Sequence, residues 1–355
     1  MSPISARRGL RLLALLLLLA VPLTLAACGS DDDDSATGTA AAATQTETAP
    51  ADSAFPVTIE HNLGSTTIES QPRRVITLGL SDQDAVLALG VAPIAVTDWY
   101  GDYEYATWPW ADAALAATAA RPTVLARGEF TGNQSYDYEQ IIGLRPDLIL
   151  ALYGGVSKKQ YDTLSKIAPT VLQPRGTVDY GIAWQDATEV VGKALGREAE
   201  ARRLVEDVDA QFAAAARDHP QFAGKTAVVA ERFEPGSSFA RSPTDPRSRF
   251  MTSLGFGLSD EIGRLSGDKD GATISDERID LLDEDLLVWN LGFSPEIRRQ
   301  LDRLAVYQAL DVVRDGRVVY VTDPLASAAL TWSTVLSIPY ALERVLPQLD
   351  RAVRG

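Results

Sequence analysis

Apolar positions along the chain follow one pattern twice. The stretch "YEQIIGLRPDLILALYG", residues 138–154, predicts a helix that runs into a short buried strand. The stretch "DERIDLLDEDLLVWNLG", residues 276–292, predicts the same two elements. Residues 139–154 and 277–292 share six identities in 16 positions without a gap, and both hold a glutamate eight positions before an aspartate. We interpret the pattern as a duplicated unit, present once in each half of the chain.

The flanking segments alternate between strand and helix patterns. A hairpin is predicted in "PVTIEHNLGSTTIES", followed by a strand in "RVITLG" and a helix in "SDQDAVLALG" that begins at Ser81 and ends at Gly90. In the second half, "KTAVVAERF", "DLLVWNL" and "GRVVYVTD" predict strands, while "ISDERIDLL" and "SPEIRRQLDRL" predict helices. Strands that alternate with helices predict a mainly parallel sheet covered on both faces.

The middle of the chain carries no strand pattern. Residues 183–217 have apolar positions at helical spacing, interrupted at Gly196, which predicts two helices. The second would have about 20 residues and a length of about 30 Å, enough for a stiff connector. We therefore predict two Rossmann-like α/β lobes joined by a single long rigid helix: residues 56–182, the helical segment 183–218, and residues 219–355.

The first 27 residues predict an export signal. Arg7, Arg8 and Arg11 precede the apolar run "LLALLLLLAVPL", which is shorter than the roughly 20 residues of a membrane span. The following "LAAC" resembles the lipobox of bacterial lipoproteins, which implies that Cys28 is acylated. A generic secretory signal and a twin-arginine signal stay open as alternatives. Residues 28–55 are acidic, small and polar, and predict a disordered tether.

Charge and cysteine content narrow the function. Without the three signal arginines, 30 basic residues stand against 48 acidic ones, a net charge of −18 that disfavours a nucleic-acid partner. Cys28 is the only cysteine, so no internal disulfide is possible. The chain has only two histidines, His61 and His219, far apart in the sequence and outside any nucleophile motif. We therefore expect neither an enzyme nor a binder of bare metal ions, and no resident cofactor.

Four segments resemble the substrate-binding proteins of iron-siderophore, haem and cobalamin ABC importers, the helical-backbone class of periplasmic binding proteins. They are "RVITLGLSDQDAVLALGVAPIAV", "YEQIIGLRPDLILALYGGVSKKQYDTLSKIAPTV", "ISDERIDLLDEDLLVW" and "LDVVRDGRVVYV…LSIPYALERVLPQL", and the resemblance spans about residues 56–350. It implies a ligand groove between the lobes and a monomer anchored by lipid to the outer face of the bacterial membrane. Because the connector is helical, we also expect only small lobe closure.

The resemblance also implies roles for the repeated glutamates and for the groove. Glu139 and Glu277 match the acids that pair with arginines of the permease dimer, although ordinary solvated helix-start glutamates would look the same. The loops after the strands supply the expected ligand residues Trp99, Tyr100, Arg127, Tyr153, Arg232, Arg241 and Trp332. The aromatic residues would otherwise be packing residues, and Arg232 and Arg241 would otherwise pair with Glu231 or Glu234.

The ligand implied is a ferric siderophore, whose oxygens suit the donor fork of arginine. Haem or cobalamin remain alternatives within the same transporter class. A surface-interaction lipoprotein that has lost transport is a further alternative.

Overall fold

The computed structural model describes residues 54–98, 101–125, 136–294 and 296–354. The predictions for the export signal, for the tether before residue 54, for Cys28, and for Trp99, Tyr100 and Arg127 therefore lie outside the described residues. The described residues belong to one compact unit.

The first lobe is built on a parallel sheet next to a hairpin. The hairpin pairs β1 (Val57–His61) with β2 (Gly64–Ile68). The sheet has the order β5-β4-β3-β6-β7, and every neighbouring pair is parallel. Its strands are β3 (Val75–Thr77), β4 (Ala95–Thr97), β5 (Thr123–Leu125), β6 (Leu148–Ala151) and β7 (Thr170–Leu172).

Helices alternate with these strands, as the pattern predicts. They are α1 (Asp82–Ala88), α2 (Asp112–Thr118), α3 (Tyr138–Leu144), α4 (Lys158–Leu164) and α5 (Trp184–Ala194). Short 3₁₀ helices cover Glu104–Ala106 and Pro109–Ala111. The buried side chains fall into two clusters, one that includes Val75 and Leu148 and one that includes Ile76 and Ile149. Because neighbouring strand residues face opposite sides, both faces of the sheet are covered.

The second lobe has a mixed sheet with a parallel centre. Its order is β11-β9-β8-β12-β13, with β10 also paired to β8. The β8–β12, β12–β13 and β8–β10 pairs are parallel, whereas β9 is antiparallel to both β8 and β11. The strands are β8 (Thr226–Glu231), β9 (Ser237–Arg241), β10 (Gly257–Leu258), β11 (Gly271–Ser275), β12 (Leu286–Asn290) and β13 (Val318–Val321).

The helices of this lobe are α7 (Pro246–Ser253), α8 (Asp260–Ser266), α9 (Ile297–Leu301), α10 (Ala305–Gln308), α11 (Asp311–Arg314), α12 (Pro324–Trp332) and α13 (Ser337–Arg354). Two 3₁₀ helices cover Pro220–Phe222 and Asp276–Leu282. None of the described helices is both long and apolar enough to cross a membrane.

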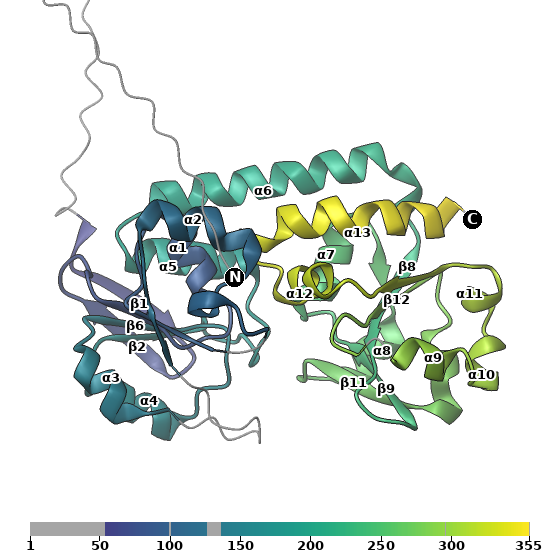
Figure 1. Ribbon diagram of the computed structural model, residues 1–355, viewed down its shortest axis with the longest axis horizontal. Helices are drawn as coiled ribbons and strands as arrows, with labels where there is room; N and C mark the ends of the chain where they lie inside the picture. The colour runs from purple at the N-terminus through teal and green to yellow at the C-terminus, as the bar shows by residue number, and fades with distance from the viewer. Residues whose placement is uncertain (1–53, 99–100, 126–135, 295, 355) are drawn as a thin grey trace, which may run out of the picture. The chain divides into compact units, whose positions relative to one another are not determined.

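A single helix carries the chain from one sheet to the other. This is α6 (Glu198–Asp218), whose 21 residues follow α5 after a break at Gly196, as predicted (Figure 1). Ala201 on its buried face belongs to a cluster of the first lobe, whereas Val208 and Phe212 belong to a cluster of the second. The fold is therefore two α/β lobes joined by a long helix; the domain limits 56–182, 183–218 and 219–355 stay predictions.

A second helix also packs into both lobes. On α12, Ala329 and Leu330 belong to the second-lobe cluster, while Ala328 and Trp332 belong to the first-lobe cluster. The Trp332 ring meets that of Trp108 edge-on at 6.4 Å between centroids. The two lobes are thus tied by packing as well as by the chain.

The two copies of the duplicated unit have only partly similar structures. The first copy is α3 followed by β6, as predicted, but the predicted helix of the second copy is wrong. Its beginning, "ISDERIDLL", forms the end of β11 and a 3₁₀ helix with non-helical backbone at Arg278. Strand pairing accounts for the first two residues, because Ile274 and Ser275 lie opposite Ser238 and Ser237 of β9.

The repeated aspartates have the same structural role. Asp147 accepts hydrogen bonds from the backbone N–H groups of Arg73 and Arg74, just before β3, at 2.9 and 2.7 Å. Asp285 accepts one from the N–H group of Thr226, the first residue of β8, at 2.9 Å. Each aspartate fixes the start of one central strand beside the start of its neighbour.

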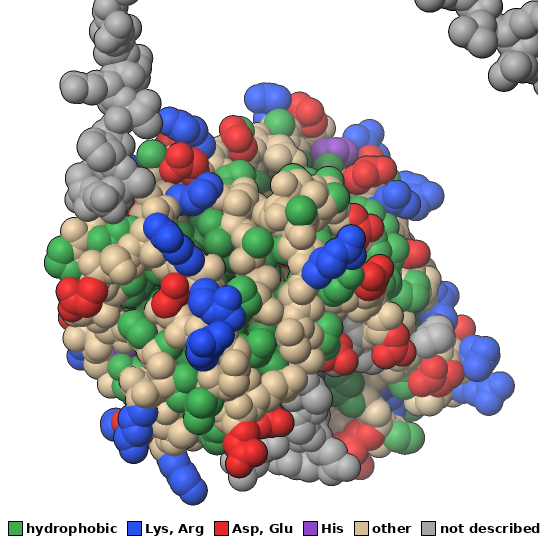
Figure 2. All heavy atoms as spheres, turned by 60° about the vertical axis from the view of Figure 1, so that its left-hand side comes forward, with side chains coloured by type: hydrophobic (Ala, Val, Ile, Leu, Met, Phe, Trp, Pro, Cys, Tyr) green, Lys and Arg blue, Asp and Glu red, His purple; other side chains and the backbone are tan. Residues whose placement is uncertain are grey.

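The surface carries both signs of charge. Figure 2 shows the face on which the left-hand side of Figure 1 comes forward, and Lys or Arg side chains are interspersed there with Asp or Glu. The net negative charge of the chain is therefore not gathered into one acidic patch on this face.

Candidate ligand-binding site

A pocket of about 380 Å³ lies between the two lobes. The first lobe contributes Leu80, Tyr153 and Tyr180 to its wall. The second lobe contributes the wall residues Glu231, Phe233, Phe239, Arg241, Asp245, Arg247, Asp270, Phe293, Thr331 and Trp332. Leu80 and Tyr153 follow β3 and β6, and Glu231 ends β8. Open parallel sheets place ligands at this end of their strands, so the pocket has the position expected of a ligand site.

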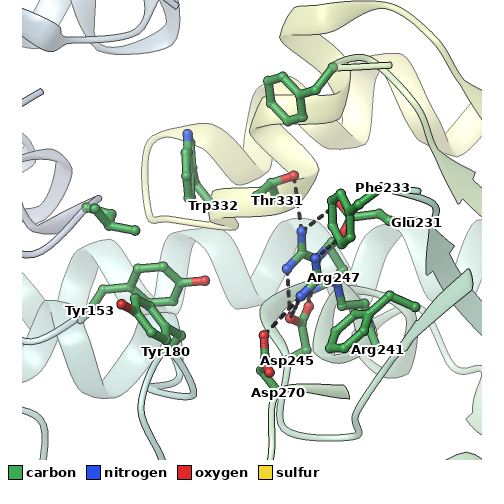
Figure 3. A pocket seen from close by; sticks show the side chains of 13 residues that line it. Tyr153, Tyr180, Glu231, Phe233, Arg241, Asp245, Arg247, Asp270, Thr331 and Trp332 are labelled. Atoms are coloured by element: carbon green, nitrogen blue, oxygen red, sulfur yellow. Dashed lines mark hydrogen bonds and ion pairs between the residues drawn. The ribbon is translucent and has the colours of Figure 1, made fainter. Parts of the chain in front are cut away.

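Aromatic rings form one wall of the pocket. Tyr153 meets Tyr180 and Trp332 edge-on, at 5.8 and 6.3 Å between ring centroids (Figure 3). Tyr180 has φ of 59°, a left-handed conformation that is uncommon for an aromatic residue and is often found at functional sites. Phe233 on the other side is 69 % exposed and lies near Phe239. Such rings offer broad, rigid contact area to a bulky ligand.

The opposite wall is a buried cluster of charged groups (Figure 3). Arg247 donates from Nε and Nη2 to the two carboxylate oxygens of Asp245, at 2.8 Å each, and from Nη1 to Glu231 at 3.0 Å. Arg241 donates to Glu231, and to Asp270 at 3.2 Å. Paired forks of this kind are rigid, because both planar groups are fixed by two bonds.

Local sequence explains how these groups meet. Glu231 and Arg241 end the neighbouring antiparallel strands β8 and β9. Asp245 caps α7 by accepting from the N–H group of Arg247, with Pro246 at the first helical position. The cap therefore brings the side chain of Arg247 back onto Asp245 while Glu231 approaches from the sheet.

The ionisation of the cluster follows from burial and pairing. Burial favours the neutral form of Asp245, but Arg247 and Arg241 outweigh it and leave the pKa of Asp245 lowered. For Arg241, burial and the nearby charge of Arg247 lower the pKa to about 10. Burial raises the pKa of the Tyr153 phenol. Both guanidinium groups therefore stay charged at neutral pH and Tyr153 stays protonated.

A buried carboxylate positions the tyrosine wall. Asp82 accepts hydrogen bonds from the backbone N–H groups of Leu152 and Tyr153, at 2.8 and 3.0 Å. Burial raises its pKa to about 6, although these backbone hydrogen bonds act in the opposite direction. A Cβ at Gly79 would lie 2.2 Å from the carboxylate, so the loop after β3 needs glycine there. Asp82 thus fixes the turn from which Tyr153 enters the pocket.

The structure brings three of the described residues of the predicted ligand set together. Tyr153, Arg241 and Trp332 all line the pocket. Arg232 does not: its guanidinium binds both oxygens of Asp276, at 2.6 and 2.8 Å. The alternative reading of Arg241 as a partner of Glu231 is confirmed, so this arginine both pairs and lines the pocket. Whether any of these residues contacts ligand stays a prediction.

Several lining residues were not predicted. Asp245 and Arg247 form part of "SPTDPR", in which Asp-Pro signals a helix start but nothing in the sequence indicates burial. Asp270 and Thr331 carry no local pattern at all. Tyr180 lies in "GTVDYGIAW", a glycine-containing connection after β7. The length of this connection is the sequence signal that could have indicated a functional loop.

The two repeated glutamates are exposed in the structure. Glu139 lies in the first turn of α3, after the capping residue Asp137, and Glu277 lies in the first turn of the 3₁₀ helix Asp276–Leu282. Each helix leads back to the start of a strand, β6 or β12, so its own beginning lies toward the pocket end of the sheet. Arg232, by binding Asp276, fixes the segment that presents Glu277.

These features define a class of protein. Residues 75–325 match the family model described as Periplasmic binding protein, which covers more than half of the chain. The chain belongs to this family of solute-binding proteins.

Individual relatives narrow the comparison. The chain is 25 % identical over 298 residues to YfiY of Bacillus subtilis, named as a siderophore-binding lipoprotein, with 80 % of this chain and 84 % of YfiY covered. A periplasmic solute binding protein of Mycobacterium smegmatis is 34 % identical with a TM-score of 0.72, over 84 % of this chain and 98 % of that one. Staphylococcus aureus SirA, solved with staphyloferrin B, is 25 % identical with a TM-score of 0.67, over 83 % and 98 %.

Proposed function

We propose that this protein captures a ferric siderophore in the pocket between its lobes and delivers it to an ABC importer. The observation that carries the proposal is the pocket itself, which has aromatic rings from both lobes and a rigid cluster of charged groups from the second lobe. The aromatic wall suits the bulk of a chelate, and the family and its siderophore-binding relatives support the cargo. Iron would arrive already chelated, since no group of three or more metal-ligating side chains occurs among the described residues.

We also propose that the protein is not an enzyme. His61 is buried and contacts the Thr66 hydroxyl at 3.0 Å, and His219 contacts Asp350 at 2.9 Å. Neither histidine lines the pocket. Both histidines are therefore committed to structural contacts, which favours a binding role.

We further propose that Cys28 carries the lipid that holds the protein at the outer face of the cell membrane. The "LAAC" sequence after an apolar signal supports the anchor, as does the lipoprotein name of the relative YfiY. Export and anchoring place the pocket outside the cytoplasm, where ferric chelates are captured.

The partner of the loaded protein would be a permease dimer. Glu139 and Glu277 support this proposal because both are exposed, and both stand at the pocket end of their lobes. Exposed ion pairs are worth about 1 kcal/mol or less each, so such docking would be reversible and salt-sensitive.

Ligand titration tests the binding claim. Trp332 lines the pocket, so a bound ferric chelate is expected to quench tryptophan fluorescence in a saturable manner, while free ferric ion does not. Trp332→Phe should reduce the amplitude of quenching, with binding then followed by retention of the coloured chelate on a desalting column. Trp289→Phe is the matched control, because Trp289 is fully buried in a different cluster. If fluorescence does not change on titration with hydroxamate, catecholate, citrate, haem and cobalamin ligands, the proposed binding function is wrong.

A further inference from the structure

The described pocket residues carry a negative balance of charge. Three carboxylates, Glu231, Asp245 and Asp270, face two guanidinium groups, Arg241 and Arg247. No lysine or histidine is among the described lining residues. Two positive charges against three negative ones leave the wall with one net negative charge.

Both guanidinium groups are already paired with carboxylates. Arg241 Nε has no hydrogen-bond partner among the described residues, but it is buried. All three nitrogens of Arg247 donate to Asp245 or Glu231, and Arg247 is only 4 % exposed. Arg241 contacts Glu231, Asp270 and, at 3.6 Å, Asp245, and its guanidinium lies 4.8 Å from the centre of the Phe239 ring. An anionic ligand that displaced Glu231 or Asp245 would leave a buried carboxylate without the partner that compensates its burial.

The charge balance is that of the described lining residues, and Trp99, Tyr100 and residues 126–135 lie outside them. Trp99 and Tyr100 are uncharged, and residues 126–135, "ARGEFTGNQS", contain one arginine and one acid, Arg127 and Glu129. Their formal charges sum to zero.

We propose that the cargo is a neutral or cationic ferric chelate of the trihydroxamate class rather than an anionic catecholate or carboxylate chelate. This inference rests on the proposed function. Three hydroxamates each carry one negative charge and together neutralise ferric iron, so only the side groups of such a ligand set its charge. Three catecholates leave the complex trianionic, and hydroxycarboxylate chelates also keep excess negative charge.

The wall then discriminates by repulsion as well as by contact. An anionic chelate loses its hydration on entering the pocket and is repelled by the net negative charge of the wall. A neutral chelate contacts the aromatic rings and the paired charged groups without this repulsion. Asp270 is the carboxylate best placed to receive a cationic side group, because its side chain is 43 % exposed at the pocket while those of Glu231 and Asp245 are buried.

Three ferric chelates of different charge test the inference on the full-length protein. They are ferric desferrioxamine B, which bears a free ammonium group, its N-acetylated neutral form, and trianionic ferric enterobactin. We expect saturable quenching by the first two and affinity for the third weaker by roughly a hundredfold or more. Tighter or equal binding of ferric enterobactin would overturn the inference and leave the proposed function standing. If no ferric chelate of any charge binds, the proposed function itself fails.

A substitution tests whether Asp270 contributes to the preference for a cationic chelate. Asp270→Asn is expected to weaken binding of the cationic chelate roughly two- to fivefold more than binding of the neutral one, as for a partly exposed ion pair. Asp268→Asn is the matched control, since it removes the same charge from an exposed residue outside the pocket wall. Equal effects of both substitutions would mean that general surface charge, not the pocket, sets the preference, and would overturn the assignment to Asp270.

Discussion

Asp82 and Asp84 are buried carboxylates two positions apart on α1, and burial raises the pKa of each to about 6. Their hydrogen bonds differ. Asp82 uses both oxygens to accept backbone N–H groups, whereas Asp84 accepts from Trp110 Nε1 and Thr334 Oγ1 with Oδ2 alone. The other oxygen of Asp84, Oδ1, is buried without a hydrogen-bond partner among the described residues. The two sites should therefore respond differently to loss of charge.

We predict that Asp84→Asn leaves the free energy of unfolding at pH 7 within about 1 kcal/mol of wild type, because an amide oxygen can keep both hydrogen bonds. Asp82→Asn should cost roughly 2 kcal/mol, because its NH₂ group would face a backbone N–H that has lost its acceptor. Urea denaturation of both variants measures the difference. Similar losses in both would contradict this account of the two sites.

The same pair gives a pH prediction. A carboxyl whose pKa is raised in the folded state binds protons more tightly there, so its contribution to stability is complete below the ordinary pKa of 3.8 and is lost as pH rises through about 6. Asp84→Asn removes one such group. The stability of this variant relative to wild type should therefore improve between pH 4 and pH 7, and unfolding curves at both values check the sign.

At the scale of elements, two helical glycines have opposite surroundings. A Cβ at Gly192 on α5 would lie 2.3 Å from Cβ of Ala201 on α6, so this glycine lets the two helices approach closely. A Cβ at Gly143 on α3 would meet nothing within 4 Å.

We predict that Gly192→Ala destabilises the protein by about 1–3 kcal/mol through overpacking at the start of α6. Gly143→Ala should instead stabilise it by about 0.5–1 kcal/mol, because alanine loses less backbone entropy in a helix. Thermal unfolding of the two variants gives the comparison. A stable Gly192→Ala variant would mean that α5 and α6 are not in tight contact.

The alternation of strands and helices was predictable because buried parallel strands and capped helices leave local patterns, as in "RVITLGLSDQDAVLALG". The end of β11 at Ile274 and Ser275 was not, because its pairing with the distant β9 overrides helical spacing. In the site, Tyr153 was predictable from its place after β6. The cluster of Arg247 with Asp245 and Glu231 was not predictable, because the sequence does not distinguish a buried ion pair from a solvated one.

At the scale of the molecule, the two lobes are held together by more than the connecting helix. α6 and α12 each place side chains in core clusters of both lobes, and Asp84 of the first lobe binds Thr334, which follows α12. Relative movement of the lobes would break these contacts. Loading with ligand should therefore change the pocket locally and leave Glu139 and Glu277 at a fixed separation, which suits docking to a partner of fixed geometry.

Docking to a symmetric permease is best tested with both acids reversed. Glu139→Arg/Glu277→Arg is expected to keep ligand affinity within about twofold, because neither residue lines the pocket, while cellular uptake of the ferric chelate falls by roughly tenfold or more. The matched control is Glu189→Arg/Glu206→Arg, which makes the same charge change at exposed positions of α5 and α6. It should leave uptake unchanged if docking uses the two repeated acids. Intact uptake in the first double variant, or equal loss in both, would mean that the repeated glutamates are ordinary solvated residues at helix starts.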